Sequence, residues 1–267
     1  MSGNSLRFTK ASACGNDFLI DEAAQLSTQY TQELVELSRR VCDRHNGIGA
    51  DGVEWLYPDS KHEAQARLFN ADGSEAEISG NGTRCVAAYL AEQKGLKEIP
   101  ILTGAGTKLC RLLHRQGPHF RFSMQMGKAE IEGELEVEVK GLKLRGQVVS
   151  TGNPHFVMLV EQFPTNWQTQ AAAISTHKQF PQGTNVELVR VLNPSAVEFR
   201  IYERGAGETQ SSGTGSCACA VAAIHAGQVS SPVDVRASGG VQTVRWQNDS
   251  LELEGDADLI CRGEFFL

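Results

Sequence analysis

The sequence has no cluster of basic residues and no long apolar run. Its formal net charge is −7, from 25 Lys and Arg against 32 Asp and Glu. A protein that binds nucleic acid non-specifically usually presents a basic face. No apolar segment approaches the roughly 18–20 residues that span a bilayer. We therefore expect a globular protein that binds neither nucleic acid nor membrane.

Cofactor motifs and cysteine pairs are also missing. The seven cysteines are odd in number and scattered, which is not the pattern of a disulfide framework. Cys217 and Cys219 are too close for a Cys-x-x-Cys pair, and no second pair lies nearby, so we expect no metal site. No phosphate-binding loop and no complete dinucleotide fingerprint occurs, so we expect no cofactor. The first five residues lack a charged segment followed by an apolar one, which predicts a cytoplasmic protein without a signal peptide.

Short segments of alternating apolar and polar residues predict many strands and few helices. Apolar residues at helical spacing, ended by glycine, predict three helices at about 31–43, 82–95 and 215–227. The predicted strands are 6–10, 66–69, 99–102, 120–126, 156–160, 187–191, 196–202, 233–237, 241–246, 251–254 and 261–266.

Two glycine-rich loops reveal an internal repeat. Ser79-Gly80-Asn81-Gly82 aligns with Ser212-Gly213-Thr214-Gly215, and a strand precedes and a helix follows each loop. The repeat predicts two similar domains. We place the boundary at the Gly-Pro breaker, giving an N-terminal domain of residues 1–117 and a C-terminal domain of 118–267. The last strand is the segment of the second domain that could pack on the first.

Each loop opens a helix, and the first turn of a helix offers unsatisfied N–H groups and a partial positive charge. Such a helix end binds a carboxylate or phosphate. The alternative is a plain helix cap. Because the two loops occupy matching places in the repeat, we interpret them as two ends that hold one carboxylate.

Polar residues at strand ends are the other candidates, because such positions are rigidly held. Arg204 can bind a carboxylate through two hydrogen bonds, or it is a solvated surface arginine. His155 can serve as a general base, or it is a hydrogen-bonded structural residue.

These segments together resemble the diaminopimelate epimerase family. Matching motifs include Gly-Asn-Asp-Phe at 15–18, Asn-Ala-Asp-Gly at 70–73 and Gly-Asn-Pro-His at 152–155. The matches follow the family's order over nearly the whole chain, at 15–18, 44–52, 69–77, 80–85, 152–155, 183–187 and 203–217. The resemblance implies an α+β fold of two pseudo-symmetric domains, each a strand-rich roll around a central helix, with the active site between them. It also implies a cofactor-independent epimerase of lysine biosynthesis.

The resemblance implies roles for named residues as well. The substrate α-carboxylate would lie at Gly80, Asn81, Gly213 and Thr214, and His155 would lie near the reacting carbon. The distal amino-acid end would be held by residues matching Asn16, Asn70, Asn153, Asn185, Glu203 and Arg204. As partner the resemblance implies the small-molecule amino acid diaminopimelate, and it leaves a homodimer open.

The departure from the family is at its catalytic pair of cysteines, where this sequence has Ser79 and Ser212. In the family one thiolate removes the α-proton and the opposite thiol returns one. A thiol has a pKa of about 8.5, whereas the pKa of an alcohol lies far higher, close to that of water. The gap of roughly 7 units amounts to about 10 kcal/mol against forming the base. The sequence therefore predicts impaired two-base catalysis.

Three hypotheses follow. The chain is an epimerase whose two cysteines have been replaced by serine, so that it is impaired or inactive. Alternatively, it is a member of the same superfamily with altered chemistry, such as elimination or exchange by one base. The third hypothesis is an amino-acid binding protein without catalysis.

Overall fold

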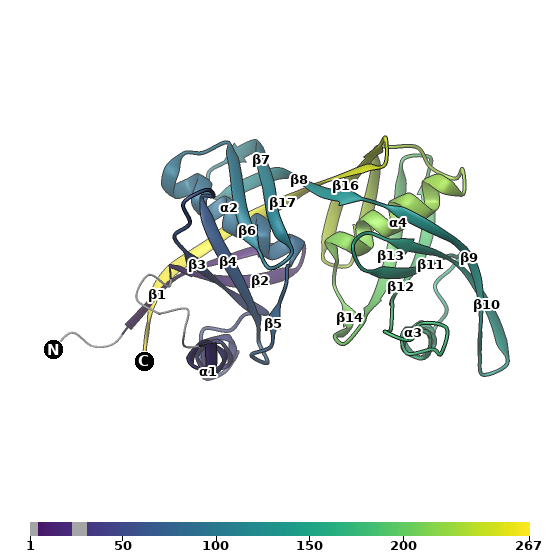
Figure 1. Cartoon of the computed structure of the whole chain (residues 1–267), viewed down its shortest axis with the longest axis horizontal. Helices are drawn as coiled ribbons and strands as arrows, with labels where there is room; N and C mark the ends of the chain where they lie inside the picture. The colour runs from purple at the N-terminus through teal and green to yellow at the C-terminus, as the bar shows by residue number, and fades with distance from the viewer. Residues whose placement is uncertain (1–4, 23–30) are drawn as a thin grey trace. The chain divides into compact units, whose positions relative to one another are not determined.

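The computed structural model describes residues 5–22 and 31–267. The prediction that the protein has no signal peptide rests mainly on residues 1–4, and these lie outside the described residues. The chain divides into two compact units (Figure 1). Unit 1 is Met1–Met124 with Gly255–Leu267, and unit 2 is Gln125–Glu254. The chain passes from unit 1 to unit 2 within strand β8 (His119–Lys128) and returns within strand β17 (Ser250–Phe266).

Unit 1 is a strand-rich roll around helix α2, whose residues from the first turn onward are mostly buried. Its elements are β1 (Ser5–Ala13), β2 (Asn16–Glu22), α1 (Thr31–Cys42), β3 (Gly52–Tyr57), β4 (Ala64–Asn70), β5 (Glu75–Ala76), α2 (Gly80–Lys94), β6 (Glu98–Thr103) and β7 (Gly106–Gln116). Helix α1 packs on β3 and β4, where Leu34 and Val41 meet Trp55 and Phe69 in a buried cluster. The Trp55 indole donates to Ser38 Oγ at 3.0 Å, which satisfies the ring nitrogen inside that core.

Unit 2 repeats this plan around helix α4, which is buried along almost its whole length. Its elements are β9 (Glu130–Val139), β10 (Leu142–Ser150), β11 (Pro154–Leu159), α3 (Trp167–Ser175), β12 (Asn185–Asn193), β13 (Ala196–Glu203), β14 (Gly207–Thr209), α4 (Gly213–His225), β15 (Val233–Ala237) and β16 (Gly240–Gln247). Figure 1 shows α2 among the strands of unit 1 and α4 among the strands of unit 2.

The internal repeat of the sequence is also present in the pairing of the strands. In unit 1, β2 runs parallel to β3 with Phe18 opposite Gly52. In unit 2, β11 runs parallel to β12 with His155 opposite Asn185. An antiparallel strand follows in each unit, β4 beside β3 and β13 beside β12. The predicted α+β class, with a strand-rich roll around a helix in each half, is confirmed.

Details of the sequence prediction differ from the structure. Both central helices begin at the first glycine of their loops, because Ser79 and Ser212 cap them. The segments 251–254 and 261–266 belong to one strand, β17. The predicted domain boundary falls in the turn between β7 and β8, whereas unit 1 extends to Met124 because β8 pairs with β7 up to that residue. No helix within 5–22 and 31–267 is long and apolar enough to cross a membrane.

Candidate active site

Ser79 forms the N-terminal end of α2. Its backbone is extended, with φ −122° and ψ 123°, and its Oγ accepts a hydrogen bond from Gly82 N at 3.1 Å. The Ser79 carbonyl accepts from Thr83 N at 2.8 Å. This is the N-cap arrangement, which contributes about 1 kcal/mol to helix stability. The cap holds the Ser79 hydroxyl at the positive end of the helix dipole.

Asn16 and Asn81 join β2 to the start of α2. Asn81 Nδ2 donates to Asn16 Oδ1 at 2.8 Å, and Asn16 Nδ2 donates to Asp51 Oδ2 at 3.1 Å. The buried Arg84 donates to Asn81 Oδ1 at 2.5 Å. The structure therefore brings together four predicted residues, Asn16, Ser79, Gly80 and Asn81, which we call the N-terminal half-site.

A set of ion pairs fixes Asp51, the carboxylate that accepts a hydrogen bond from Asn16. Arg44 contacts Asp17 at 2.8 Å and Asp51 at 2.7 Å, and Lys10 contacts Asp17 at 2.9 Å. Partial burial would raise the pKa of Asp17, but the hydrogen bonds from Arg44 and Lys10 outweigh burial and lower it. Asp51 is thus held in place to accept from Asn16. The sequence identified the segment 44–52 only as a match to the family and gave Arg44 and Asp51 no role.

Ser212 caps α4 in the same way as Ser79 caps α2. Its backbone is extended, and its Oγ accepts from Gly215 N at 3.2 Å. Its hydroxyl also lies 3.3 Å from Thr214 Oγ1, and Asn153 Nδ2 donates to the same Thr214 oxygen at 3.5 Å. Asn153, Ser212, Gly213 and Thr214 form the C-terminal half-site, the counterpart of the first.

His155 lies fully buried behind this half-site. Its Nε2 is 2.9 Å from Asn153 Oδ1, and because a carbonyl oxygen only accepts, Nε2 carries the proton. Its Nδ1 is 2.6 Å from Glu187 Oε1. Burial raises the pKa of the Glu187 carboxyl, while the contact with His155 opposes the rise. Both ring nitrogens are therefore engaged within unit 2, where His155 orients Asn153.

The other predicted residues of unit 2 lie at the ends of β12 and β13. Asn185 donates to Pro154 O at 3.1 Å and accepts from Arg204 N at 2.9 Å, which ties three segments together. Arg204 is exposed, and one of its guanidinium nitrogens donates to Gln182 O at 2.9 Å. Glu203 Oε1 accepts from Thr209 Oγ1 at 2.6 Å.

Asn70 lies apart from the N-terminal half-site's hydrogen bonds. It is exposed at the end of β4, and its side chain donates to Ser74 Oγ at 3.0 Å within its own turn. Its predicted role in binding substrate stays a prediction.

Two buried carboxyls at matching positions were missed by sequence reasoning. Glu54 on β3 and Glu187 on β12 are 3% and 0% exposed, respectively. Each lies against a glycine in the first turn of the central helix. A Cβ on Gly82 would meet Glu54 Oε1 at 2.2 Å, and a Cβ on Gly215 would meet Glu187 Oε1 at 3.1 Å. The available signal was an acidic residue inside an apolar strand at the same place in both repeats.

The tight fit at Gly82 leads to a prediction about stability. We expect Gly82→Ala to lower the free energy of unfolding by about 1–2 kcal/mol, because overpacking in a core outweighs the better helix propensity of alanine. In a Glu54→Ala background the same change should be neutral or stabilising, since the obstructing carboxyl is gone. Urea unfolding of the unaltered protein, the two single variants and the double variant gives the coupling free energy between residues 82 and 54. An equal cost in both backgrounds would contradict the contact.

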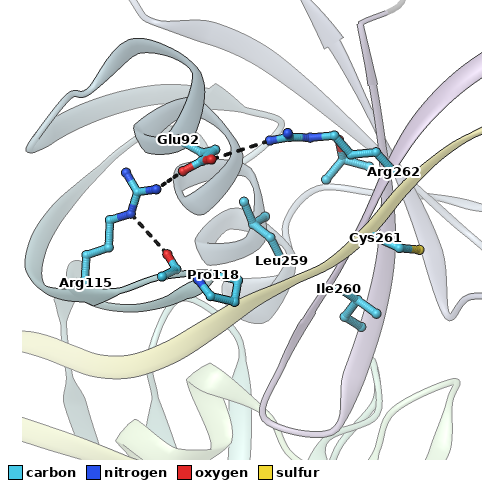
Figure 2. Close-up of a pocket in the computed structure, with 9 residues that line it drawn as sticks. Glu92, Arg115, Pro118, Leu259, Ile260, Cys261 and Arg262 are labelled. Atoms are coloured by element: carbon cyan, nitrogen blue, oxygen red, sulfur yellow. Dashed lines mark hydrogen bonds and ion pairs between the residues drawn. The ribbon is translucent and has the colours of Figure 1, made fainter.

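A cavity of about 550 Å³ lies elsewhere in unit 1, between Arg115, Pro118 and the segment Leu259–Arg262. Figure 2 shows Arg115 and Arg262 reaching toward Glu92. Lining residues include none of the predicted site residues, so the cavity is separate from the half-site. Across the part of the chain that the structure describes, no group of three or more His, Cys, Asp or Glu could hold a metal ion.

Sequence comparisons place the chain among known proteins. The family model described as diaminopimelate epimerase matches residues 8–132 and 147–260. The chain is 36% identical over 278 residues to the diaminopimelate epimerase of Pelotomaculum thermopropionicum, covering 97% of this chain and 99% of that protein. It is 34% identical over 287 residues to that of Bacillus licheniformis, covering 99% of each chain.

Solved structures share the fold at low identity. A phenazine biosynthesis protein of Bacillus anthracis aligns with a TM-score of 0.74 at 15% identity, covering 99% of this chain and 100% of that chain. A hydroxyproline epimerase of Agrobacterium vitis, with trans-4-hydroxy-L-proline bound, aligns with a TM-score of 0.72 at 17% identity, covering 99% and 92%. At these identities the likeness concerns the fold alone.

Proposed function

Because this chain belongs to the diaminopimelate epimerase family, we propose that it binds diaminopimelate and moves the α-proton of that substrate, interconverting the LL and meso isomers in lysine biosynthesis. The observation that carries the proposal is the pair of serine-capped helix ends, each tied to an asparagine from the preceding strand region.

The α-carboxylate is the group that the helix ends would hold. First-turn N–H groups have no acceptor within the helix and favour an anion. Asn81 and Thr214, in the first turns, are fixed by Asn16 and Asn153, so the ends are organised before substrate arrives. Such preorganisation lowers the cost of binding. Arg204 is exposed and uses one guanidinium nitrogen on Gln182 O, and a guanidinium suits the second carboxylate of diaminopimelate.

Serine in both half-sites makes the proton transfer slow. A hydroxyl held by a backbone N–H at 3.1 Å or 3.2 Å gains some stabilisation of its anion, but one neutral hydrogen bond contributes only about 0.5–1.5 kcal/mol. This is far below the roughly 10 kcal/mol gap between alcohol and thiol. Binding is therefore retained while inversion is impaired.

One-base exchange is the second candidate, because the half-sites differ behind their serines. Unit 2 has the His155–Glu187 pair at 2.6 Å, whereas Phe18 occupies the place of the histidine in unit 1. A site with unequal groups on its two sides can exchange the α-proton of one isomer without inverting it.

Calorimetry with LL-diaminopimelate and proton NMR in deuterated water test the proposal together. We expect saturable binding, and slow loss of the α-proton signal from LL- or meso-diaminopimelate. Exchange with isomer interconversion supports the epimerase, and exchange without it supports the one-base candidate. Binding without any exchange would indicate an amino-acid binding protein without catalysis. Absence of binding would contradict the epimerase, the one-base enzyme and the binding protein alike.

A further inference from the structure

Glu54 is a buried carboxyl that lacks the partner its counterpart has. All six residues of β3 are buried, and Glu54 itself is 3% exposed. Within 5–22 and 31–267, neither a hydrogen bond nor an ion pair to its carboxyl is found. An unpaired polar group in the interior costs free energy. A residue kept at such a cost suggests a role outside packing.

The repeat shows where this carboxyl lies. Glu187 occupies the same place in unit 2, and both its Oε1 and the Cβ of Ser212 are 3.1 Å from the point where a Gly215 side chain would begin. The carboxyl and the capping serine thus lie on the same side of the first turn. In unit 1 the carboxyl of Glu54 presses even closer on Gly82, the residue whose N–H donates to Ser79.

The difference between the units is the partner of the carboxyl. Glu187 is bonded to His155, which occupies it. The matching position in unit 1 is Phe18, whose ring lies beside Gly82 and cannot share a proton. Glu54 is therefore the carboxyl that is free to gain or lose a proton at a helix end.

We propose that Glu54 is the acid–base residue of the N-terminal half-site, carrying the α-proton that the family's thiol carries at position 79. The inference rests on the proposed function. Ionised Glu54 removes the proton from the substrate α-carbon. The C–H bond breaks, its electron pair enters the α-carbon–carboxylate system as an enediolate, and an O–H bond forms on Glu54. The reverse step returns the proton, so no oxidant or reductant is needed.

The chemistry of the carboxyl suits this role. Burial raises the pKa of Glu54 to about 8, and an acid–base catalyst works best when its pKa lies near the working pH. The hydroxyl of Ser79 is an alcohol, whose pKa lies near that of water and far above that range. Ser79 keeps its place as the helix cap, and Glu54 provides the group that titrates.

The test compares exchange from two isomers in deuterated water. If the proposed function holds, one acid–base group serves each face of the α-carbon, and LL- and meso-diaminopimelate lose their protons to different groups. In Glu54→Gln we expect exchange from one isomer to fall about 10²–10⁴-fold, while the other stays within about threefold. Glu54→Asp should recover part of the loss. Thermal unfolding and calorimetric binding of the substrate confirm that each variant is folded and competent.

Other results overturn the inference. An equal fall for both isomers would show a structural role, no fall would show that Glu54 is a bystander, and a rise would show that it obstructs the site. In those cases the unaltered protein still exchanges, and the proposed function survives. If the unaltered protein binds diaminopimelate but exchanges neither isomer, the proposed function fails and the inference fails with it.

Discussion

Replacing Ser79 and Ser212 together by cysteine should raise the rate of LL-to-meso conversion by about 10³-fold or more. A thiol forms its anion at a pKa near 8.5, whereas the pKa of an alcohol lies far higher, close to that of water. A positioned acid–base group contributes about 10²–10⁴-fold, and the double change adds a thiol to each half-site, including the C-terminal one, which has no such group at Ser212. Cysteine is close to serine in shape, so the backbone of both helix ends should be retained. Coupled optical assays or chiral chromatography of the products measure the conversion.

Matched variants separate this effect from side effects. Each single variant should increase exchange from one isomer with little inversion, because one thiol serves one face. Ser60→Cys, on the exposed segment between β3 and β4 of unit 1, adds a thiol outside the half-sites and should leave the rate unchanged. Sulfur accepts more weakly from Gly82 N and Gly215 N, so each cap should lose up to about 1 kcal/mol. If the double variant folds but shows no LL-to-meso conversion, the half-sites do not hold the α-carbon where a thiol can reach it.

The sequence predicted those helices and strands that have a clear local signal at their ends or along their length. Glycines close both central helices, and alternation along Phe120–Met126 matches its place in β8. Helix α3 was missed because it is short, has no side-chain cap at Asn166 and carries no flanking glycine. Strand β9 was missed because five glutamates stand among its four apolar residues, and β10 because Lys143 and Arg145 interrupt its first apolar residues.

The site could be predicted only in part. The glycine loops and the repeat identified Ser79 and Ser212, and the structure shows both as caps. The residues that contact those loops and their neighbours come from distant parts of the sequence. Asn16 meets Asn81 across 65 positions, and His155 meets Glu187 across 32. Neither spacing has a local signature, so a repeated acidic residue inside an apolar strand was the one clue to the carboxyls.

Glu54→Gln should stabilise the protein at alkaline pH, the opposite of what a buried hydrogen-bonded residue would show. Burial raises the pKa of Glu54 to about 8 in the folded state, from 4.5 when the carboxyl is exposed. Below pH 4.5 both states hold the proton, and ionisation contributes nothing. Between the two pKa values the unfolded chain binds fewer protons than the folded one, so stability falls as pH rises, by about 1.4 kcal/mol per pH unit. Above pH 8 the full penalty is present.

Glutamine has the same shape and does not titrate, so the variant escapes this penalty. The gain over the unaltered protein should be near zero at pH 4.5 and on the order of 4 kcal/mol at pH 9. Urea unfolding across that range measures it. The titration of neighbouring groups does not obscure the result. Burial raises the pKa of the Cys85 thiol on α2, and the charge of Glu54 raises it further, so this thiol stays neutral. Neither Phe18 from β2 nor Leu68, opposite Glu54 on β4, titrates.

Glu187→Gln is the matched control, because Glu187 shares a proton with His155 at 2.6 Å. Removing that contact leaves a buried histidine nitrogen with a poorer partner, so this variant should lose stability and show no alkaline gain. If Glu54→Gln also lost stability at every pH, Glu54 would have a hidden structural partner. If instead it gains stability at pH 9 while losing proton exchange from one isomer, the same carboxyl weakens the fold and serves the reaction. That combination is the expected trade-off for a group placed by function, and packing alone does not produce it.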